Sequence, residues 1–309
     1  MGFKGPSRQK APMDAPGRKV LALVIYLCVH ACAGLVVPLT GPKPATVLQG
    51  ISLPRVSDGT EVNLGSALEP ASGKTLLVLG THAGDFNMVE YAQKVRHFLP
   101  QLKDKGIDRC MMVVNGEANT ASKLADLLDL PPEIELLADP SGEAGRKFGV
   151  SRGFRPDDAD LPPAAKLFFM GIGLGPPWMT LPAVMIGYFG NPGGRRDWIE
   201  GALKQGQLAG RWPAPLELGG SGEILGNKFD TTPLVAGWGV RPFELATLRL
   251  QNLIGVQLKH REALKYADDR CLTQLGGCTV VGPAGAPLYS WLDQGLCDVP
   301  DMHDLLDAI

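Results

Sequence analysis

The chain has 309 residues, of which 45% are apolar, so it can bury a substantial core as one large domain or two modest ones. The 30 lysines and arginines against 32 acidic residues give a net charge of -2, which offers no broad attraction for a polyanion. Composition therefore excludes an intrinsically disordered chain and argues against nucleic acid as a partner.

Residues 1–33 are predicted to form a targeting segment. A basic start leads into an uncharged run from Val20 to Leu39, and Ala31-Cys-Ala33 offers the small residues that a signal peptidase needs. A retained membrane anchor is the competing interpretation, because about 20 apolar residues can span a bilayer. A third is the signal half of a bipartite plastid-targeting sequence. We expect a plastid location, with the secretory pathway as the alternative, and a linker over residues 34–50.

Apolar and amphipathic runs alternate over residues 51–155. Short apolar runs predict buried strands, and apolar residues at helical spacing predict helices. The predicted order is strand 75–79, helix 87–105, strand 110–114, helix 119–128, strand 134–138 and a short helix 142–148. Strands separated by helices imply βαβ units and a parallel sheet, so the predicted fold class is α/β.

An apolar insertion is predicted over residues 156–214. Its stretch 167–194 holds no charged residue and is broken by prolines, which argue against a straight spanning helix. Membrane contact through 167–194 would therefore use two short interfacial helices, with Trp178 and Tyr188 suited to that depth. The alternative is a hydrophobic flap over the sheet or a surface for a partner.

Residues 215–260 are predicted to supply the second part of the core. Residues 216–218 and 223–229 flank a Gly-rich turn, which is typical of a β-hairpin, and a final helix is predicted over 241–254. Residues 261–309 are predicted to be a C-terminal extension outside this core.

The order βαβαβα followed by ββα is that of a thioredoxin-like fold with an extra helix. Several stretches resemble the peroxiredoxin-like subgroup of the alkyl hydroperoxide reductase and thiol-specific antioxidant (AhpC/TSA) superfamily, in its cyanobacterial and algal members: Leu79 to Leu102, Cys110 to Asn115, Leu136 to Pro140 and Gly145 to Gly149. The resemblance covers about residues 50–260. It implies a thiol-dependent antioxidant activity with a thioredoxin-type reductant. We expect no cofactor and no metal.

The helix that follows strand 75–79 is where that superfamily keeps its reactive cysteine, because the helix dipole there favours a thiolate. The matching window, Thr81 to Ala92, contains no cysteine. Asn87 with Glu90 instead fits a capping box, and Asp85 adds negative charge at the same helix end. His82 and Asp85 are candidates for a general acid-base pair, against the alternative of a capped helix after a polar loop.

Cys271 and Cys278 are the candidate catalytic residues, since they lie seven residues apart with a flexible Gly276-Gly277 between them. With Cys297 they could form a disulfide switch or a relocated redox pair, against the alternatives of one stabilising disulfide or free thiols. A zinc site that adds His303 is disfavoured, because the spacing matches no usual zinc pattern. Cys110 opens a strand and is predicted to be a buried apolar residue.

Two function classes follow from these patterns. The first is a thiol-dependent peroxidase or oxidoreductase, and the second is a non-catalytic thioredoxin-like scaffold or assembly partner at a plastid membrane. Three arginines are candidates, by position only, for the basic side chains of a peroxidatic site: Arg109, Arg146 and Arg152. Three aspartates beside prolines predict a solvated turn rather than a metal site: Asp157, Asp158 and Asp160.

Overall fold

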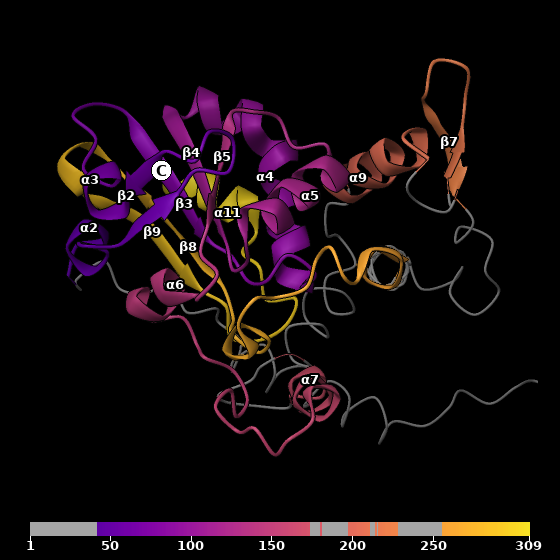
Figure 1. Cartoon of the computed structure of the whole chain (residues 1–309). Coiled ribbons are helices and arrows are strands. Elements are labelled where there is room, and N and C mark those ends of the chain that lie inside the picture. Colours follow the sequence, from indigo (N-terminus) through magenta and orange to yellow (C-terminus); the bar gives the residue numbers. More distant parts are fainter. Residues whose placement is uncertain (1–41, 174–179, 181–196, 211–213, 215, 228–254) are drawn as a thin grey trace, which may run out of the picture.

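A five-stranded sheet forms the centre of the computed structural model, which describes residues 42–173, 180, 197–210, 214, 216–227 and 255–309 (Figure 1). The strand order is β5-β4-β3-β8-β9. These strands are β3 (Lys74–Leu79), β4 (Ile107–Val114), β5 (Ile134–Ala138), β8 (Gly277–Val281) and β9 (Pro287–Leu292). The first three run parallel to one another, whereas β8 is antiparallel to both β3 and β9. The predicted α/β class is confirmed, with a mixed sheet.

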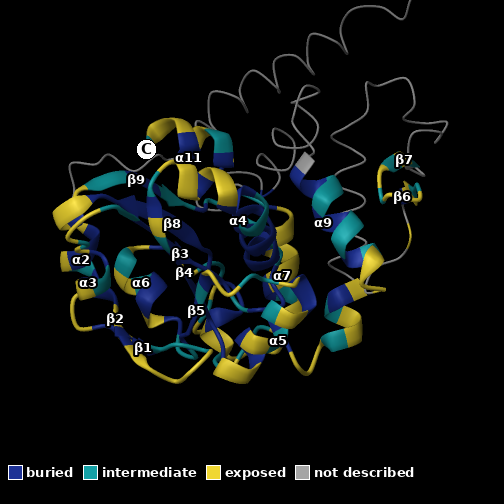
Figure 2. Ribbon diagram, turned by 90° about the horizontal axis from the view of Figure 1, so that it is seen from above, coloured by how far each residue is buried: buried dark blue, intermediate teal, exposed yellow. Residues whose placement is uncertain are grey.

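Helices cover both faces of the sheet, and the dark-blue buried residues of Figure 2 lie between them. Because successive strand residues point to opposite faces, Leu76 and Val78 pack on one side while Leu77 and Leu79 pack on the other. The first face is covered by α4 (Phe86–Asp104), α5 (Ala118–Leu128), α9 (Asp197–Leu208) and α11 (Met302–Ala308). The second is covered by α2 (Pro44–Val47), α3 (Leu64–Ala67) and α6 (Glu143–Phe148).

Smaller elements surround this core. Two short two-stranded sheets are β1 (Ser52–Pro54) with β2 (Glu61–Asn63) and β6 (Leu216–Leu218) with β7 (Ile224–Asn227). The 3-10 helices are η2 (Asp269–Cys271) and η3 (Pro283–Gly285). Helix α7 (Pro163–Gly171) lies below the sheet in Figure 1, and the β6–β7 hairpin lies at the far end of α9.

The second half of the central sheet comes from a different part of the chain than predicted. The hairpin at residues 216–227 forms, but as a separate sheet, and β8 and β9 occupy its expected place. The prediction that residues 215–260 complete the core while 261–309 lie outside it is therefore wrong. The physical reason is that β8 consists of uncharged residues, among them the β-branched Thr279, Val280 and Val281, which suit a fully buried central strand beside β3, whereas β6 is short and carries Glu217.

Some predictions lie outside the described residues: the targeting segment, residues 34–41 of the linker, the helix at 241–254, and most of the uncharged stretch 167–194. The rest of the predicted linker is not a linker, because it contains α2 and buries Ala45 and Leu48 in the core. Within the described ranges, none of the helices combines the length and the apolar character that crossing a bilayer requires.

Candidate functional site

The turn from β3 into α4 is built without a thiol. A side chain at Gly80 would come within 2.5 Å of the Val113 carbonyl oxygen, so the chain passes tightly beside β4. Asp85 caps the helix: its Oδ2 accepts hydrogen bonds from the Thr81 hydroxyl at 2.6 Å and the Asn87 backbone N–H at 3.2 Å. The N-terminal donors of α4 are thus partly satisfied by a carboxylate of the helix's own N-cap.

The predicted capping box of Asn87 and Glu90 is wrong. Asp85 is the N-cap, Asn87 is the second residue of the helix, and Glu90 forms a buried ion pair with Lys94 at 2.8 Å. The side chain of Asn87 takes no part in capping. It is hydrogen-bonded instead to residues more than 200 positions later in the sequence. The added negative charge of Asp85 at this helix end is confirmed.

Asn87 binds residues 293–297, a loop distant in the sequence, at the start of α4. Its amide Nδ2 donates to Asp293 Oδ2 at 2.7 Å and to the Gly295 carbonyl oxygen at 3.1 Å, while its Oδ1 accepts from the Cys297 backbone N–H at 2.7 Å. Asn87 is fully buried, and Cys297 is held at φ +68°, a conformation that few residues other than glycine adopt. The helix start is therefore covered by residues 293–297.

Further contacts continue this cover along α4. The Tyr91 hydroxyl donates to Asp293 Oδ1 at 2.7 Å, and Lys94 Nζ donates to the Pro300 carbonyl oxygen at 2.9 Å. The ammonium of Lys94 also lies 5.3 Å from the ring centroid of Trp198 on α9. We call the segment Asp293–His303 the C-terminal strap, because it follows α4 from its start to its middle.

Cys271 and Cys278, the predicted catalytic pair, lie in different surroundings, and both are free thiols. Cys271 ends η2 and its Sγ lies 3.8 Å from the Pro140 carbonyl oxygen, beyond the carboxyl end of β5. Cys278 pairs with Val78 in the centre of the sheet and contributes to the core under α4. The flexible-loop pairing expected for them is not seen, because Gly277 and Cys278 are fixed in β8.

Burial disfavours the thiolate form of these cysteines. It raises the pKa of the Cys271 thiol to about 11, with Asp268 adding to the rise and Arg146 opposing it. It raises the pKa of the Cys278 thiol even further, with the Asp293 carboxylate adding to the rise. Cys110 is buried as predicted, and burial raises the pKa of its thiol to about 12. A nucleophilic thiolate is unfavourable at each of these positions near neutral pH.

His82 and Asp85 do not form the hydrogen-bonded pair that acid-base chemistry would need. The His82 ring packs edge-on against Tyr266, and its Nδ1 has no hydrogen-bond partner among the described residues. Burial lowers the pKa of His82, and the Asp85 carboxylate opposes that shift. His82 therefore contributes to packing between the helix start and the segment before η2.

The three candidate arginines bind partners away from the start of α4. Arg109 is bonded to Glu135 of β5 at 2.8 Å, Arg152 to Asp157 at 2.5 Å, and Arg146 to the Ser141 carbonyl oxygen at 2.6 Å. No basic side chain among them is directed to the site where a peroxide would be expected to bind.

The aspartates of the 156–163 loop form a turn. Asp158 accepts hydrogen bonds from the backbone N–H groups of Asp160 and Leu161 and pairs with Arg155. In the part of the chain that the structure describes, no three His, Cys, Asp or Glu side chains converge as metal ligands.

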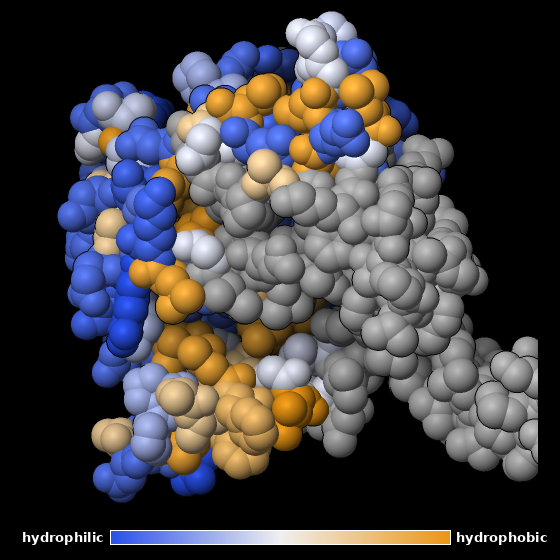
Figure 3. Space-filling view, turned by 90° about the vertical axis from the view of Figure 1, so that its right-hand side faces the viewer, coloured by the Kyte–Doolittle hydropathy of each residue, from blue (hydrophilic) through white to orange (hydrophobic). Residues whose placement is uncertain are grey.

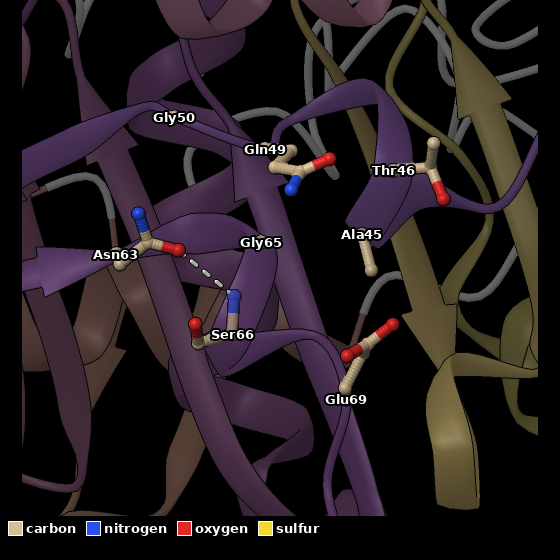
Figure 4. Close-up of a pocket in the computed structure, with 8 residues that line it drawn as sticks. All are labelled: Ala45, Thr46, Gln49, Gly50, Asn63, Gly65, Ser66 and Glu69. Atoms are coloured by element: carbon tan, nitrogen blue, oxygen red, sulfur yellow. Dashed lines mark hydrogen bonds between the residues drawn. The ribbon is translucent and has the colours of Figure 1, made fainter.

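A polar depression lies between α2 and α3, on the opposite face of the sheet from α4 (Figure 4). Glu69 is the one ionisable residue in its lining, and the Asn63 Oδ1 atom that faces it caps α3 by accepting from the Ser66 N–H at 3.0 Å. Asn63 thus stabilises α3, and the polar residues that line the depression form no cluster suited to catalysis.

Comparisons with protein-family models, curated proteins and solved structures give no match for this chain. The resemblance seen in the sequence therefore stays a prediction. The residues that sequence reasoning missed are those of the strap, above all Asp293. No local signal identifies it, since its partners Asn87 and Tyr91 lie some 200 positions away.

Proposed function

We propose that this chain is a thioredoxin-like module that works as a non-catalytic binding or assembly partner. The element order supports the thioredoxin-like part: β3-α4-β4-α5-β5-α6 is followed, after the insertion, by β8-β9-α11, which matches βαβαβα and then ββα. This order matches the predicted pattern once β8 and β9 replace the hairpin at 216–229.

The covered start of α4 is the observation that carries the non-catalytic part of the proposal. A peroxidatic site needs an accessible thiolate at that helix end, where the free N–H groups and the dipole stabilise its charge. Here Asp85 accepts two of the hydrogen bonds at that end, and Asn87 binds the strap across it. The antioxidant role implied by the resemblance would have to rely on Cys271 and Cys278, whose burial disfavours the thiolate.

A peroxide-consumption assay with thioredoxin and its reductase tests this proposal. We expect no turnover above the rate without the protein, and no change of cysteine oxidation state by mass spectrometry after mild peroxide treatment. Turnover that disappears in a Cys271→Ser, Cys278→Ser variant would overturn the proposal and favour the thiol-dependent enzyme. Turnover that persists in that variant would overturn it as well and would point to Cys297, the half-buried thiol among the described cysteines.

Contact with a membrane through the insertion is the second part of the proposal. Helix α7 and its C-cap Ile172 expose four bulky apolar side chains, of which Phe168 (61% exposed) and Ile172 (46%) lie one helical turn apart, and Leu167 and Phe169 lie beside them. Figure 3 shows hydrophobic residues, in orange and tan, gathered at the bottom of the view, the level at which α7 lies in Figure 1. This helix leads into the uncharged stretch that ends before Arg195, a pattern that favours an interfacial location.

Flotation with phosphatidylcholine vesicles tests membrane contact. We expect the full chain to float with the vesicles and a Phe168→Ser, Ile172→Ser variant to stay in the dense fraction. Leu258→Ser is the matched control, because Leu258 is 76% exposed but lies outside α7. Equal flotation of all three proteins, or no flotation of the unmodified chain, would remove this part of the proposal.

We also propose that residues 1–33 direct the protein to a plastid, on the strength of the basic start, the uncharged run and the small residues at 31–33. Fusion of residues 1–50 to a fluorescent protein tests this. Fluorescence in the endomembrane system alone would favour the secretory pathway.

A further inference from the structure

A second depression lies where α7 begins. We call it the α7 depression. It has a volume of about 320 Å³ and is lined by residues from two stretches, 156–166 and 269–272, both of which the structure describes. The first stretch is the loop before α7 with the first turn of that helix, and the second is η2 with Leu272. Half of the lining residues are apolar and half are charged, which suits a ligand that has both a charged and an apolar part.

Lys166 is the buried charge of this lining. It is 5% exposed, and its Nζ donates to the Pro156 carbonyl oxygen at 3.2 Å. Pro156 also lines the α7 depression, so the ammonium group lies at its wall. An ammonium group has three donors, and no carboxylate of the described residues forms an ion pair with this one. Because lysine is almost never fully buried without a partner, Lys166 needs a counter-ion that the depression could hold.

The other charges of the lining are paired or exposed. Three of them are already in ion pairs, which are Asp157 with Arg152, Asp158 with Arg155 and Arg270 with Asp268. The fourth is Asp269, which is exposed, so water screens its charge. Lys166 is therefore the charge of the lining that neither an ion pair nor solvent compensates.

The start of α7 adds to the positive potential at this place. Pro163, the first residue of the helix, lines the α7 depression, so the positive end of the helix dipole lies there. The N-cap Pro162 makes no side-chain hydrogen bond, and the first turn holds no acidic residue. An anion in the depression would thus meet both a buried ammonium group and an uncapped helix start.

The apolar half of the lining indicates what accompanies the anion. It consists of Pro156, Ala159, Leu161, Pro163 and Leu272. Helix α7 continues from Lys166 directly into Leu167, Phe168 and Phe169, which are among the exposed apolar side chains proposed above to contact a membrane. A charged site beside apolar side chains matches an anionic phospholipid, which joins a phosphate to acyl chains.

We propose that the α7 depression binds the head group of an anionic membrane phospholipid, with Lys166 as the counter-ion of its phosphate. The proposal rests on the membrane contact proposed above and names the class of lipid. The net charge of the chain is -2, so the protein has no general attraction for an anionic surface. A preference for anionic vesicles would therefore come from a local site.

Flotation with two kinds of vesicle tests the proposal: phosphatidylcholine alone, and phosphatidylcholine mixed with the anionic phosphatidylglycerol. We expect the unmodified chain to bind the mixed vesicles about fivefold more tightly, the effect of about one lysine at a membrane surface. Lys166→Met keeps a long apolar side chain without the ammonium group and should bind both kinds equally. Lys105→Met is the control, because Lys105 is exposed and lies outside the depression, and it should keep the preference.

The outcomes separate the lipid assignment from the membrane contact. Flotation without a preference for mixed vesicles, or a preference that Lys166→Met retains, would overturn the lipid assignment and leave the contact through α7 in place. If the unmodified chain floats with neither kind of vesicle, the membrane contact is wrong and the lipid assignment is wrong with it.

Glycerol phosphate distinguishes a lipid from a soluble ligand, because it has the same phosphate ester without acyl chains. In calorimetric titration of the full chain we expect no saturable binding below about 1 mM. Saturable binding that Lys166→Met abolishes and Lys105→Met keeps would show a site for soluble phosphate esters and overturn the lipid assignment.

Acetylation of the unmodified chain decides the case if Lys166→Met fails to fold. We expect mixed vesicles to slow the acetylation of Lys166 by several-fold relative to phosphatidylcholine vesicles, as read by mass spectrometry, while Lys105 reacts equally with both. Equal acetylation of Lys166 in the two kinds of vesicle would overturn the proposal.

Discussion

Helices α4 and α7 differ in how far their apolar side chains are buried. Helix α4 buries its face under β8, α9 and the strap, and polar groups inside that contact are bonded to named partners such as Asn87 to Asp293. Helix α7 leaves Phe168 61% exposed, and its C-cap Ile172 is 46% exposed.

This difference bears on function. Burying polar groups is unfavourable unless they are hydrogen-bonded, so the bonded polar groups along α4 fix the strap in one position. Exposed aromatic side chains have no such requirement and are available to a membrane or partner. The side of the molecule where a redox site is expected is thus the closed one, and the exposed apolar side chains lie elsewhere.

The largest expected effect comes from Lys94→Met. It leaves the Glu90 carboxylate buried without its ammonium partner and frees the Pro300 carbonyl oxygen, so we expect a loss of about 3 to 5 kcal/mol in the free energy of unfolding. Urea denaturation measures it. Lys103→Met is the control, since Lys103 is half-exposed, and should cost less than about 1 kcal/mol. Equal effects of the two changes would contradict the importance of the strap contacts.

Asn87→Ala should be next, because it removes the Asn87 Oδ1 acceptor of the Cys297 N–H and the Asn87 donor to Asp293 Oδ2, which leaves Asp293 with Tyr91. We expect the free energy of unfolding to fall by about 3 kcal/mol and the hydrogen exchange of the strap amides to become faster. Asn119 occupies the same second position of α5 but is exposed, so Asn119→Ala should change stability by less than about 0.5 kcal/mol. A change of stability at Asn87 with no change in strap exchange would mean that the loss is local to the helix start.

The pH dependence of stability should contain a contribution from Glu90. Its pKa lies at about 6 in the folded protein, above the ordinary value of 4.5, so the folded state holds the proton more tightly. The stability that this group contributes is complete below the unfolded pKa and is lost as the pH rises through about 6. The difference in the free energy of unfolding between the unmodified chain and Glu90→Gln should change by about 2 kcal/mol across that range. A difference in the free energy of unfolding that does not vary with pH would contradict this assignment.

The smallest expected effect is that of Phe168→Ser. Since this side chain is 61% exposed, we expect stability to change by less than about 0.5 kcal/mol. The urea midpoint measures it alongside the vesicle assay. A loss as large as that of Asn87→Ala would show that α7 is packed in solution, and the contrast between the two helices would disappear.

The first half of the core is predictable because its signals are local. The apolar run at 75–79 and the helical spacing of Val95, Leu99 and Leu102 predict β3 and α4 within one or two residues. Asp85 at the helix end is found in the same way, since capping needs only residues a few positions apart. The absence of a thiol from the start of α4 is likewise evident from the sequence.

The second half and the site are not predictable by the same means. Gly277 to Val281 carries glycine and cysteine at its start, which suggested a flexible loop, although it forms a fully buried strand beside β3. The role of Asn87 was also misjudged, because a capping box and a long-range hydrogen bond require the same amide and only the position of Asp293 decides between them.

The sequence by itself determined the α/β class, the elements from β3 to α6, and the missing cysteine, because helix and strand periodicity and composition are properties of neighbouring residues. The tertiary structure alone decided that β8 and β9 complete the sheet, that Cys271 and Cys278 lie apart, and that Asp293 and Asn87 meet. Those outcomes depend on contacts between residues some 200 positions apart, whose formation is governed by the packing of the whole core.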